Sequence, residues 1–212
     1  MNPTLHAPFL QEITLSSPAE KVSQLLNQQT KHILAYAPWP KFNYKPEVSF
    51  TLAHGKDVIF LKFFIREEAI RAIHLNPNDP VYEDSCVEFF IGFNNEPDYY
   101  NFEFNFAGTC LLGYGSDRDR KLHPAHHIKK IRHHSLIRNP EDELIYWEIT
   151  LVIPAEVLIY HHITDLSKIS SRVNFFKCGD GLPRAHYLCW NNIESRELNF
   201  HQSKFFGQAD FG

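Results

Sequence analysis

Three glutamates in this sequence are spaced so that they could act together at a site. Glu88, Glu103 and Glu148 each stand in a run where apolar and polar residues alternate. Successive side chains of a strand point to opposite faces, so each carboxylate lies away from its apolar neighbours. If the strands are adjacent, three carboxylates gather on one sheet face and need a cation, a basic side chain or hydroxyl donors. A solvated face with well-separated carboxylates is the equal alternative.

Histidines and cysteines are the other candidates for metal or redox chemistry. No Cys or carboxylate stands at matching spacing near the main histidine cluster, and Pro124 disturbs a helix there, so we favour a solvated loop or edge strand over a transition-metal site. The four cysteines form no C-x-x-C pair. Three disulfide pairings are open, but free buried thiols are favoured. The residues are His123, His126, His127, His133 and His134, and Cys86, Cys110, Cys178 and Cys189.

Composition narrows the classes of protein. The 212 residues are 43% hydrophobic and 22% charged, with a net charge of -4, which excludes a disordered or fibrous chain. The 21 Lys and Arg are scattered, which argues against a nucleic-acid groove or a membrane surface as partner. No apolar run approaches the length of a membrane span. No signal peptide is visible at the start, so a cytoplasmic location is expected if that start is native.

The elements that must position these residues are mostly strands. The spacing Ser17-Pro18-Ala19-Glu20 predicts a capped helix, and residues 154–158 a helical turn. We therefore expect an all-β fold, an antiparallel β-sandwich of jelly-roll type with one or two short helices. It forms a single domain over residues 1–212, in which residues 1–46 are an N-terminal extension packed on the sandwich. Alternation predicts strands at residues 48–52, 58–65, 86–93, 102–106, 147–153, 173–178 and 187–190.

One strand carries a recognisable motif. The residues from Tyr82 to Ile91, Tyr-Glu-Asp-Ser-Cys-Val-Glu-Phe-Phe-Ile, resemble the D-S-V-E-h-F-h strand of the family 9 carbohydrate-binding modules, where h is apolar. The likeness is nearest to the bacterial family-9-like branch. Residues 58–63, 146–154 and 199–207 resemble three further family segments in the same order. The resemblance covers the chain from Glu47 to the C-terminus.

The resemblance implies a sandwich that binds sugars without cleaving them, usually beside a glycoside hydrolase. In the family two rings clamp a terminal sugar, and calcium is structural. Matched position by position, the acidic sugar-binding residue falls on Glu88 and the two rings on Tyr82 and near Phe200. The family's Arg falls near Glu103, which reverses the charge. Oxygen-rich stretches that could hold calcium are Asp117-Arg118-Asp119 and residues 94–98, although neither has EF-hand spacing.

Sugar recognition also fits the residue types. A sugar presents C–H groups to an aromatic plane and hydroxyls to carboxylate, amide and guanidinium groups. Trp190, followed by Asn191, ends a predicted strand and serves either the core or the site, whereas Trp147 within a strand belongs to the core. The predicted carbohydrate-binding residues are Tyr82, Glu88, Glu103, Trp190, Asn191 and Phe200, and no catalytic residue is predicted.

Two rival functions stay open beside a non-catalytic sugar-binding module that assists polysaccharide breakdown. A glycoside hydrolase could use Glu88 with Glu103 or Glu148 as its two carboxylates. The sequence has neither Gly-x-Ser-x-Gly nor a P-loop, so other enzyme classes have no motif support. A protein-interaction sandwich that has lost its sugar site would show an exposed apolar patch in place of a polar cleft.

Overall fold

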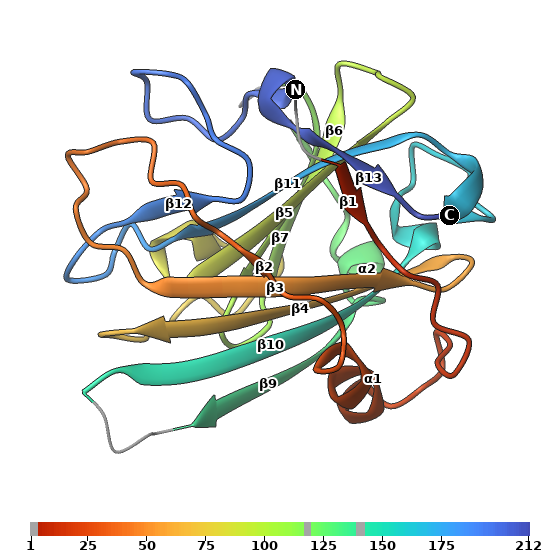
Figure 1. Ribbon diagram of the computed structural model, residues 1–212, viewed down its shortest axis with the longest axis horizontal. Coiled ribbons are helices and arrows are strands. Elements are labelled where there is room, and N and C mark those ends of the chain that lie inside the picture. The colour runs from red at the N-terminus through yellow and green to blue at the C-terminus, as the bar shows by residue number, and fades with distance from the viewer. Residues whose placement is uncertain (1–3, 117–119, 139–142) are drawn as a thin grey trace.

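Two β-sheets face each other in the computed structural model, which describes residues 4–116, 120–138 and 143–212 (Figure 1). The first sheet carries the strand with the family motif at its centre. Its pairing is antiparallel except that β1 runs parallel to β13. In spatial order its strands are β1 (Thr4–His6), β13 (Gly207–Asp210), β11 (Ser171–Cys178), β5 (Cys86–Phe93), β6 (Tyr99–Asn105), β7 (Cys110–Gly115) and β8 (Lys121–Leu122), with β12 (Tyr187–Cys189) also paired to β11.

The second sheet is antiparallel throughout. Short helices join and cover the two sheets: α1 (Ala19–Leu26), α2 (Ala125–Ile128) and the 3-10 turns η1 (Val81–Glu83), η2 (Ala155–Val157), η3 (Leu166–Lys168) and η4 (Ser203–Phe205). The all-β sandwich and its few short helices are confirmed. In spatial order the strands of the second sheet are β2 (His32–Ile33), β3 (Glu47–His54), β4 (Val58–Glu67), β10 (Ile145–Pro154) and β9 (Arg132–Arg138).

Aromatic rings fill the space between the sheets. Phe175 of the first sheet stacks on Phe50 of the second, with ring centroids 3.7 Å apart, and on its neighbour Phe89 at 5.1 Å. Trp147 is fully buried in this core, as predicted. Burial of each such side chain contributes about 1.5–3 kcal/mol of hydrophobic stabilisation. The core therefore fixes the position of the two sheets relative to each other and, with it, the position of the side chains on their outer faces.

Both outer faces of the sandwich are covered as well. On the second sheet, Val22 and Leu26 of α1 pack against Phe60 of β4, and Figure 1 shows α1 beside β10 and β9. On the first sheet, Trp39 and Phe200, which lie far apart in the sequence, join one apolar cluster with the strand residues beneath. The outward carboxylates of β5 and β6 therefore enter a covered layer and not open solvent.

The N-terminal segment takes part in both sheets. Residues 1–46 were expected to pack on the sandwich as an extension, and within them β1 adds a strand to the first sheet and β2 adds one to the second. The predicted capping box does not form: Pro18, and not Ser17, is the N-cap residue of α1, and it makes no side-chain cap. The Ser17 hydroxyl instead accepts a hydrogen bond from the backbone N–H of Thr14, which closes the turn before the helix.

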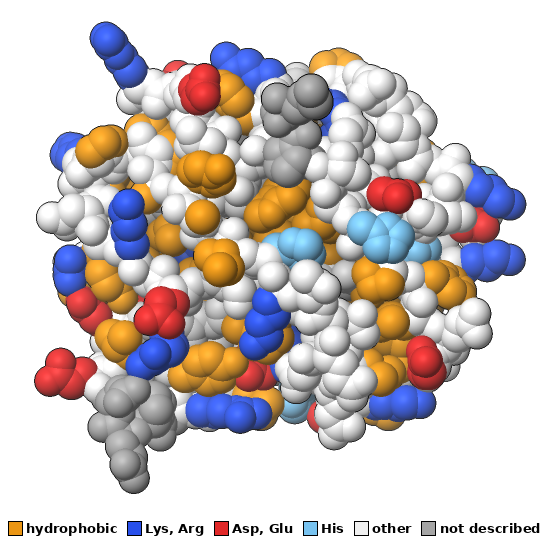
Figure 2. All heavy atoms as spheres, in the orientation of Figure 1, with side chains coloured by type: hydrophobic (Ala, Val, Ile, Leu, Met, Phe, Trp, Pro, Cys, Tyr) orange, Lys and Arg blue, Asp and Glu red, His pale blue; other side chains and the backbone are white. Residues whose placement is uncertain are grey.

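Charges of both signs share the surface. Figure 2 shows Lys and Arg side chains interspersed with Asp, Glu and small apolar areas on the face that it draws. None of the helices in the described part of the chain has the length and apolar character needed to cross a bilayer. The surface charge on this face therefore marks no binding site, and the search for one turns to the cavities.

Candidate functional site

A cavity of about 370 Å³ opens on the outer face of the first sheet. Strands β5 and β6 supply two of its carboxylates, and the loop after β11 supplies a third, Asp180. The 3-10 turn η1 supplies a tyrosine, and the C-terminal segment supplies an aromatic wall. Four of the six predicted site residues, Tyr82, Glu88, Glu103 and Phe200, line this one cavity. The other lining residues, which the sequence analysis did not name as site residues, are Arg120, Cys178, Asp180, Tyr187, Leu198, Asn199 and His201.

Two of the three carboxylates that line the cavity, Glu88 and Glu103, face each other across neighbouring strands. Glu88 of β5 pairs in register with Glu103 of β6, and the two residues are only 4% and 3% exposed. The Cys178 thiol donates to Glu88 Oε1 at 3.0 Å, and the Asn101 amide donates to Glu103 Oε1 at 2.9 Å. Glu103 Oε2 is buried and has no hydrogen-bond partner among the described residues. A buried carboxylate oxygen without a partner calls for a donor from a ligand or water.

Burial dominates the electrostatics of this pair. Desolvation, followed by the negative charge of Glu103, raises the pKa of Glu88 well above its ordinary value. Desolvation also raises the pKa of Glu103, although the Arg120 guanidinium and the Asn101 amide act against it. Like charges this close in a low-dielectric layer cannot both ionise without cost. The pair therefore keeps a proton more readily than exposed glutamates do.

Arg120 brings a guanidinium into the cavity from the loop that follows β7. Its Nη1 lies 3.8 Å from Glu103 Oε1, donates to Asn101 Oδ1, and contacts His201 Nε2 at 2.9 Å. The family's Arg was matched near Glu103 and appeared to be lost. The structure shows that a guanidinium reaches the site from another segment, so donors and acceptors stand side by side. No periodic pattern marks this loop residue in the sequence.

The two predicted clamp rings differ in what they offer. Tyr82 is 40% exposed and presents its ring at the rim of the cavity. Phe200 is 8% exposed, because one of its faces stacks on Phe176 with centroids 4.3 Å apart and Trp39 lies against it at 5.4 Å. The rings of Tyr82 and Phe200 thus belong to the same cavity, with Tyr82 as the accessible one.

Trp190 and Asn191 do not line this cavity. Strand alternation continues past β12, so the Trp190 ring turns inward and packs edge-on against Phe50 and Phe175, with centroids 6.2 and 5.9 Å away. Asn191 is held by backbone contacts, since its amide donates to the carbonyl oxygen of Phe205 at 2.8 Å. Of the two roles left open for Trp190, the structure therefore supports the core.

The strands of the three glutamates are not all neighbours, so the arrangement in which three carboxylates share one face does not form: Glu148 lies apart from Glu88 and Glu103. This residue lies on β10 in the second sheet, where Lys62 Nζ is 2.5 Å from Glu148 Oε2 and the Tyr146 hydroxyl donates at 2.6 Å. Burial raises the pKa of Glu148, but hydrogen bonds from Lys62 and Tyr146 outweigh it and hold the pKa below the ordinary value. Glu148 is thus part of an ion pair on the opposite sheet and cannot act with Glu88.

The predicted histidine cluster divides among several environments. His133 and His134 lie on β9, a strand at the edge of the second sheet, which agrees with the predicted loop or edge strand. His126 and His127 lie on the short helix α2. His123 is buried, and its pKa is lowered to about 4 by desolvation. All four cysteines are buried free thiols, as favoured, and desolvation raises the pKa of Cys86 to about 12.

Calcium stays a prediction. The stretch Asp117-Arg118-Asp119 lies outside the described residues. In the other candidate, residues 94–98, Asn94 and Asn95 form the turn between β5 and β6 with φ angles of 50° and 58°. Glu96 Oε2 in that turn lies 3.3 Å from His161 Nε2. Calcium takes six to eight oxygen ligands, and the Glu96 carboxylate already contacts a histidine. This turn is therefore a weak candidate for a calcium site.

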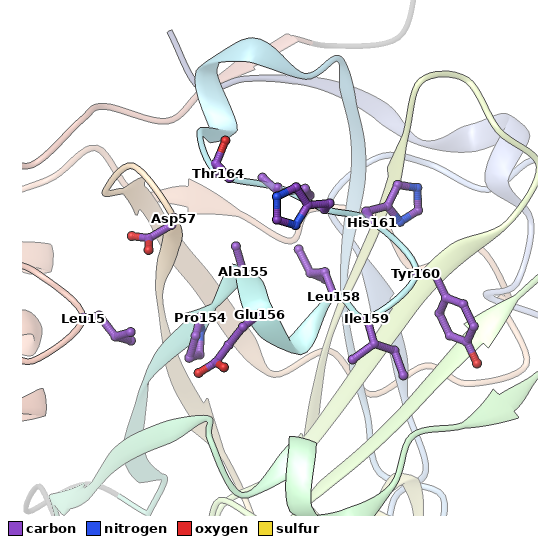
Figure 3. Close-up of a pocket in the computed structure, with 12 residues that line it drawn as sticks. Leu15, Asp57, Pro154, Ala155, Glu156, Leu158, Ile159, Tyr160, His161 and Thr164 are labelled. Carbon is purple, nitrogen blue, oxygen red and sulfur yellow. The ribbon is translucent and has the colours of Figure 1, made fainter.

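A second, larger cavity lies along residues 154–164 and has a volume of about 810 Å³. Its carboxylates are exposed, and Glu156 is engaged by Lys130 at 2.5 Å. Figure 3 shows Asp57 and Glu156 on one side and Tyr160 on the other, with its hydroxyl directed away from them. One face of the Tyr160 ring already stacks on Tyr114 at 4.2 Å. The larger cavity therefore lacks the convergence of buried polar groups found in the smaller one.

The fold is a β-sandwich module with a polar cavity on the outer face of its first sheet. The chain belongs to carbohydrate-binding family 9, whose model matches residues 20–211. This match confirms the resemblance seen in the sequence and extends it into the N-terminal segment. Modules of this family are non-catalytic, so the expectation that the chain is not an enzyme is confirmed, and the glycoside hydrolase alternative is set aside.

Solved structures agree with this assignment. A protein from Bacteroides uniformis, provisionally described as carbohydrate-binding, is 31% identical with a TM-score of 0.90, and 99% of each chain is covered. Two structures of a family 9 module from Caldicellulosiruptor kristjanssonii, with glucose and with cellotriose, are 8% identical and share the fold, with TM-scores of 0.62 and 0.59. They cover 98% of this chain and 95% and 93% of their own. None of the curated proteins compared with the chain matches it.

Proposed function

We propose that the cavity between Tyr82, Glu103 and Phe200 binds the end of a carbohydrate chain. The observation that carries the proposal is the meeting, in one cavity, of an accessible aromatic ring and a buried carboxylate oxygen with no partner among the described residues. The ring suits the C–H face of a pyranose, and the carboxylate accepts from its hydroxyls. Arg120 stands beside them as a donor for hydroxyl oxygens.

The size of the cavity limits the ligand. Small-molecule sites typically enclose about 300–1,000 Å³, and this cavity of about 370 Å³ is near the lower bound. One or two sugar units fit such a space better than a long stretch of polysaccharide. The glucose and cellotriose complexes of the Caldicellulosiruptor module make glucose and short β-glucans the first ligands to test. Family membership supports an accessory role beside a glycoside hydrolase in polysaccharide breakdown.

Calorimetric titration of the protein with glucose, xylose, galactose, cellobiose and cellotriose tests the proposal. We expect Tyr82→Ala to weaken binding about tenfold through the loss of stacked apolar area. We expect Glu103→Gln to weaken it by about tenfold or more, because a hydrogen bond to a charged acceptor contributes roughly 1.5–3 kcal/mol.

Tyr160→Ala is the matched control, since it removes a tyrosine of similar exposure, 44% against 40%, from the larger cavity. This variant should bind sugar as the wild type does. If no sugar in the panel binds, or if Tyr160→Ala loses affinity while Tyr82→Ala keeps it, the proposed site is wrong.

A further inference from the structure

Three potential metal ligands meet beside the cavity, and two of them, Glu88 and Cys178, line it. A thiol sulfur of Cys86, a carboxylate oxygen of Glu88 and the thiol sulfur of Cys178 all lie within 4.8 Å of one another. Among residues 4–116, 120–138 and 143–212, this is the one group of three or more His, Cys, Asp or Glu ligand atoms so close together. All three residues are at least 96% buried, which separates them from the acidic clusters common on protein surfaces.

Strand geometry places these three side chains on one face. Cys86 and Glu88 are two residues apart on β5 and so point the same way. Cys178 of β11 is directly paired with Cys86, and its sulfur lies 3.0 Å from Glu88 Oε1. Two adjacent central strands therefore hold all three ligands, and neither strand can shift without breaking the sheet. The position of the ligands is fixed before any cation arrives.

We propose that Cys86, Glu88 and Cys178 form a binding site for a thiophilic divalent cation, Zn²⁺ being the one that fits best. Zinc takes thiolate sulfur at about 2.3 Å and carboxylate oxygen at about 2.0–2.2 Å, usually in a tetrahedron. Ligand atoms of such a tetrahedron are roughly 3.4–3.8 Å apart, so the observed separations need only small side-chain adjustments. Glu88 and Cys178 also line the cavity, which leaves the fourth position open to water.

The donor set separates this site from a calcium site. Calcium is a hard cation that takes six to eight oxygen ligands, whereas two sulfurs select a softer metal. The cation would lie next to Glu103, which is paired in register with Glu88, and its positive charge would offset that of the carboxylates. The inference concerns these three ligands alone and does not depend on whether sugar binds in the cavity.

Cobalt substitution on the reduced, full-length protein is the decisive experiment. Co²⁺ replaces Zn²⁺ in tetrahedral sites, and thiolate ligation gives it a charge-transfer absorption that histidine and carboxylate ligation lack. We expect one equivalent of Co²⁺ per chain to produce this absorption, one equivalent of Zn²⁺ to abolish it, and an excess of Ca²⁺ to leave it unchanged. The absorption also excludes the 13 histidines as the source of the signal.

Cysteine variants complete the test. Cys86→Ser/Cys178→Ser should lose the absorption, while Cys110→Ser/Cys189→Ser, which changes two buried thiols outside the cluster, should keep it. The proposal is overturned if the reduced wild type, which needs no variant to fold, gives no thiolate absorption. It is equally overturned if the signal survives in Cys86→Ser/Cys178→Ser.

Discussion

Glu88 and Glu103 face each other across neighbouring strands, almost fully buried at the cavity, an arrangement that lowers the stability of the folded protein. Each carboxylate has its pKa raised by desolvation, which means that the folded protein resists their ionisation. Two apolar side chains in place of Glu88 and Glu103 would be buried at a lower cost in folding free energy. Buried polar groups of this kind are typical of sites where a ligand completes the hydrogen bonding, as Glu103 Oε2 requires.

The raised pKa of Glu88 has a measurable consequence for stability. In the unfolded chain Glu88 loses its proton near the ordinary value of 4.5, whereas the folded state keeps the proton to higher pH. Between these two pKa values the folded state binds more protons, so the free energy of unfolding of the wild type falls as pH rises. Glu88→Gln cannot ionise, so we expect its stability relative to the wild type to increase as the pH rises above about 4.5.

Urea unfolding at several pH values measures this difference. Glu12→Gln, which changes an exposed glutamate, is the control and should track the wild type at every pH. A Glu88→Gln stability difference that stays constant across the range would contradict the assignment of a raised pKa to this carboxylate.

At the scale of elements, alternation predicted the strands that build the site but not the loops that complete it. The predicted bounds of β5 agree with the structure, and Glu88 was placed on the correct face. Strands β1, β2 and β8 span two or three residues, too few for a period of two to show. Arg120 and His201 reach the cavity through tertiary packing, which leaves no local pattern in the sequence.

Alternation also could not decide which strands become neighbours. Glu148 has the same local pattern as Glu103, yet one lies on the second sheet and the other on the first. The sequence was equally compatible with Trp190 in the core and in the site. A residue just after a strand can follow the strand's alternation and point inward, or it can belong to the next loop and point outward. Strand order is set by contacts distant in sequence, so a single sequence predicts the faces of strands better than their pairing.

A buried lysine adds polar contacts to the apolar packing of α1 on the second sheet. Lys62 Nζ donates to Ser23 Oγ at 2.8 Å and Asn27 Oδ1 at 2.7 Å, and pairs with Glu148. We expect Lys62→Met to lower the free energy of unfolding by about 3–5 kcal/mol, because it leaves the Glu148 carboxylate buried without its cation.

The double variant Lys62→Met/Glu148→Leu is the control for that loss. It removes both charges and should recover much of the stability in urea unfolding. If Lys62→Met is as stable as the wild type, the prediction is wrong. The Glu148 carboxylate would then not need the charge of Lys62.

At the scale of the whole molecule, the N-terminal segment is part of both sheets. β1 pairs with β13, β2 pairs with β3, and Trp39 packs on Phe200 at the cavity wall. Removing residues 1–46 would also uncover Phe60 and the apolar surface beneath α1. We expect the fragment 47–212 to lose cooperative thermal unfolding and to expose apolar surface to a hydrophobic dye, with the full chain as reference. A fragment that melts cooperatively at the full-length temperature would contradict this.

The wall formed by Asn199, Phe200 and His201 has a consequence for the order of biosynthesis. Glu88, Glu103 and Arg120 leave the ribosome well before these residues, and β13 follows them. Protein synthesis adds residues at roughly 5–20 per second, so several seconds separate the synthesis of Arg120 from that of His201. A polypeptide that ends before residue 199 would carry both glutamates and the guanidinium but would lack the wall that closes the cavity.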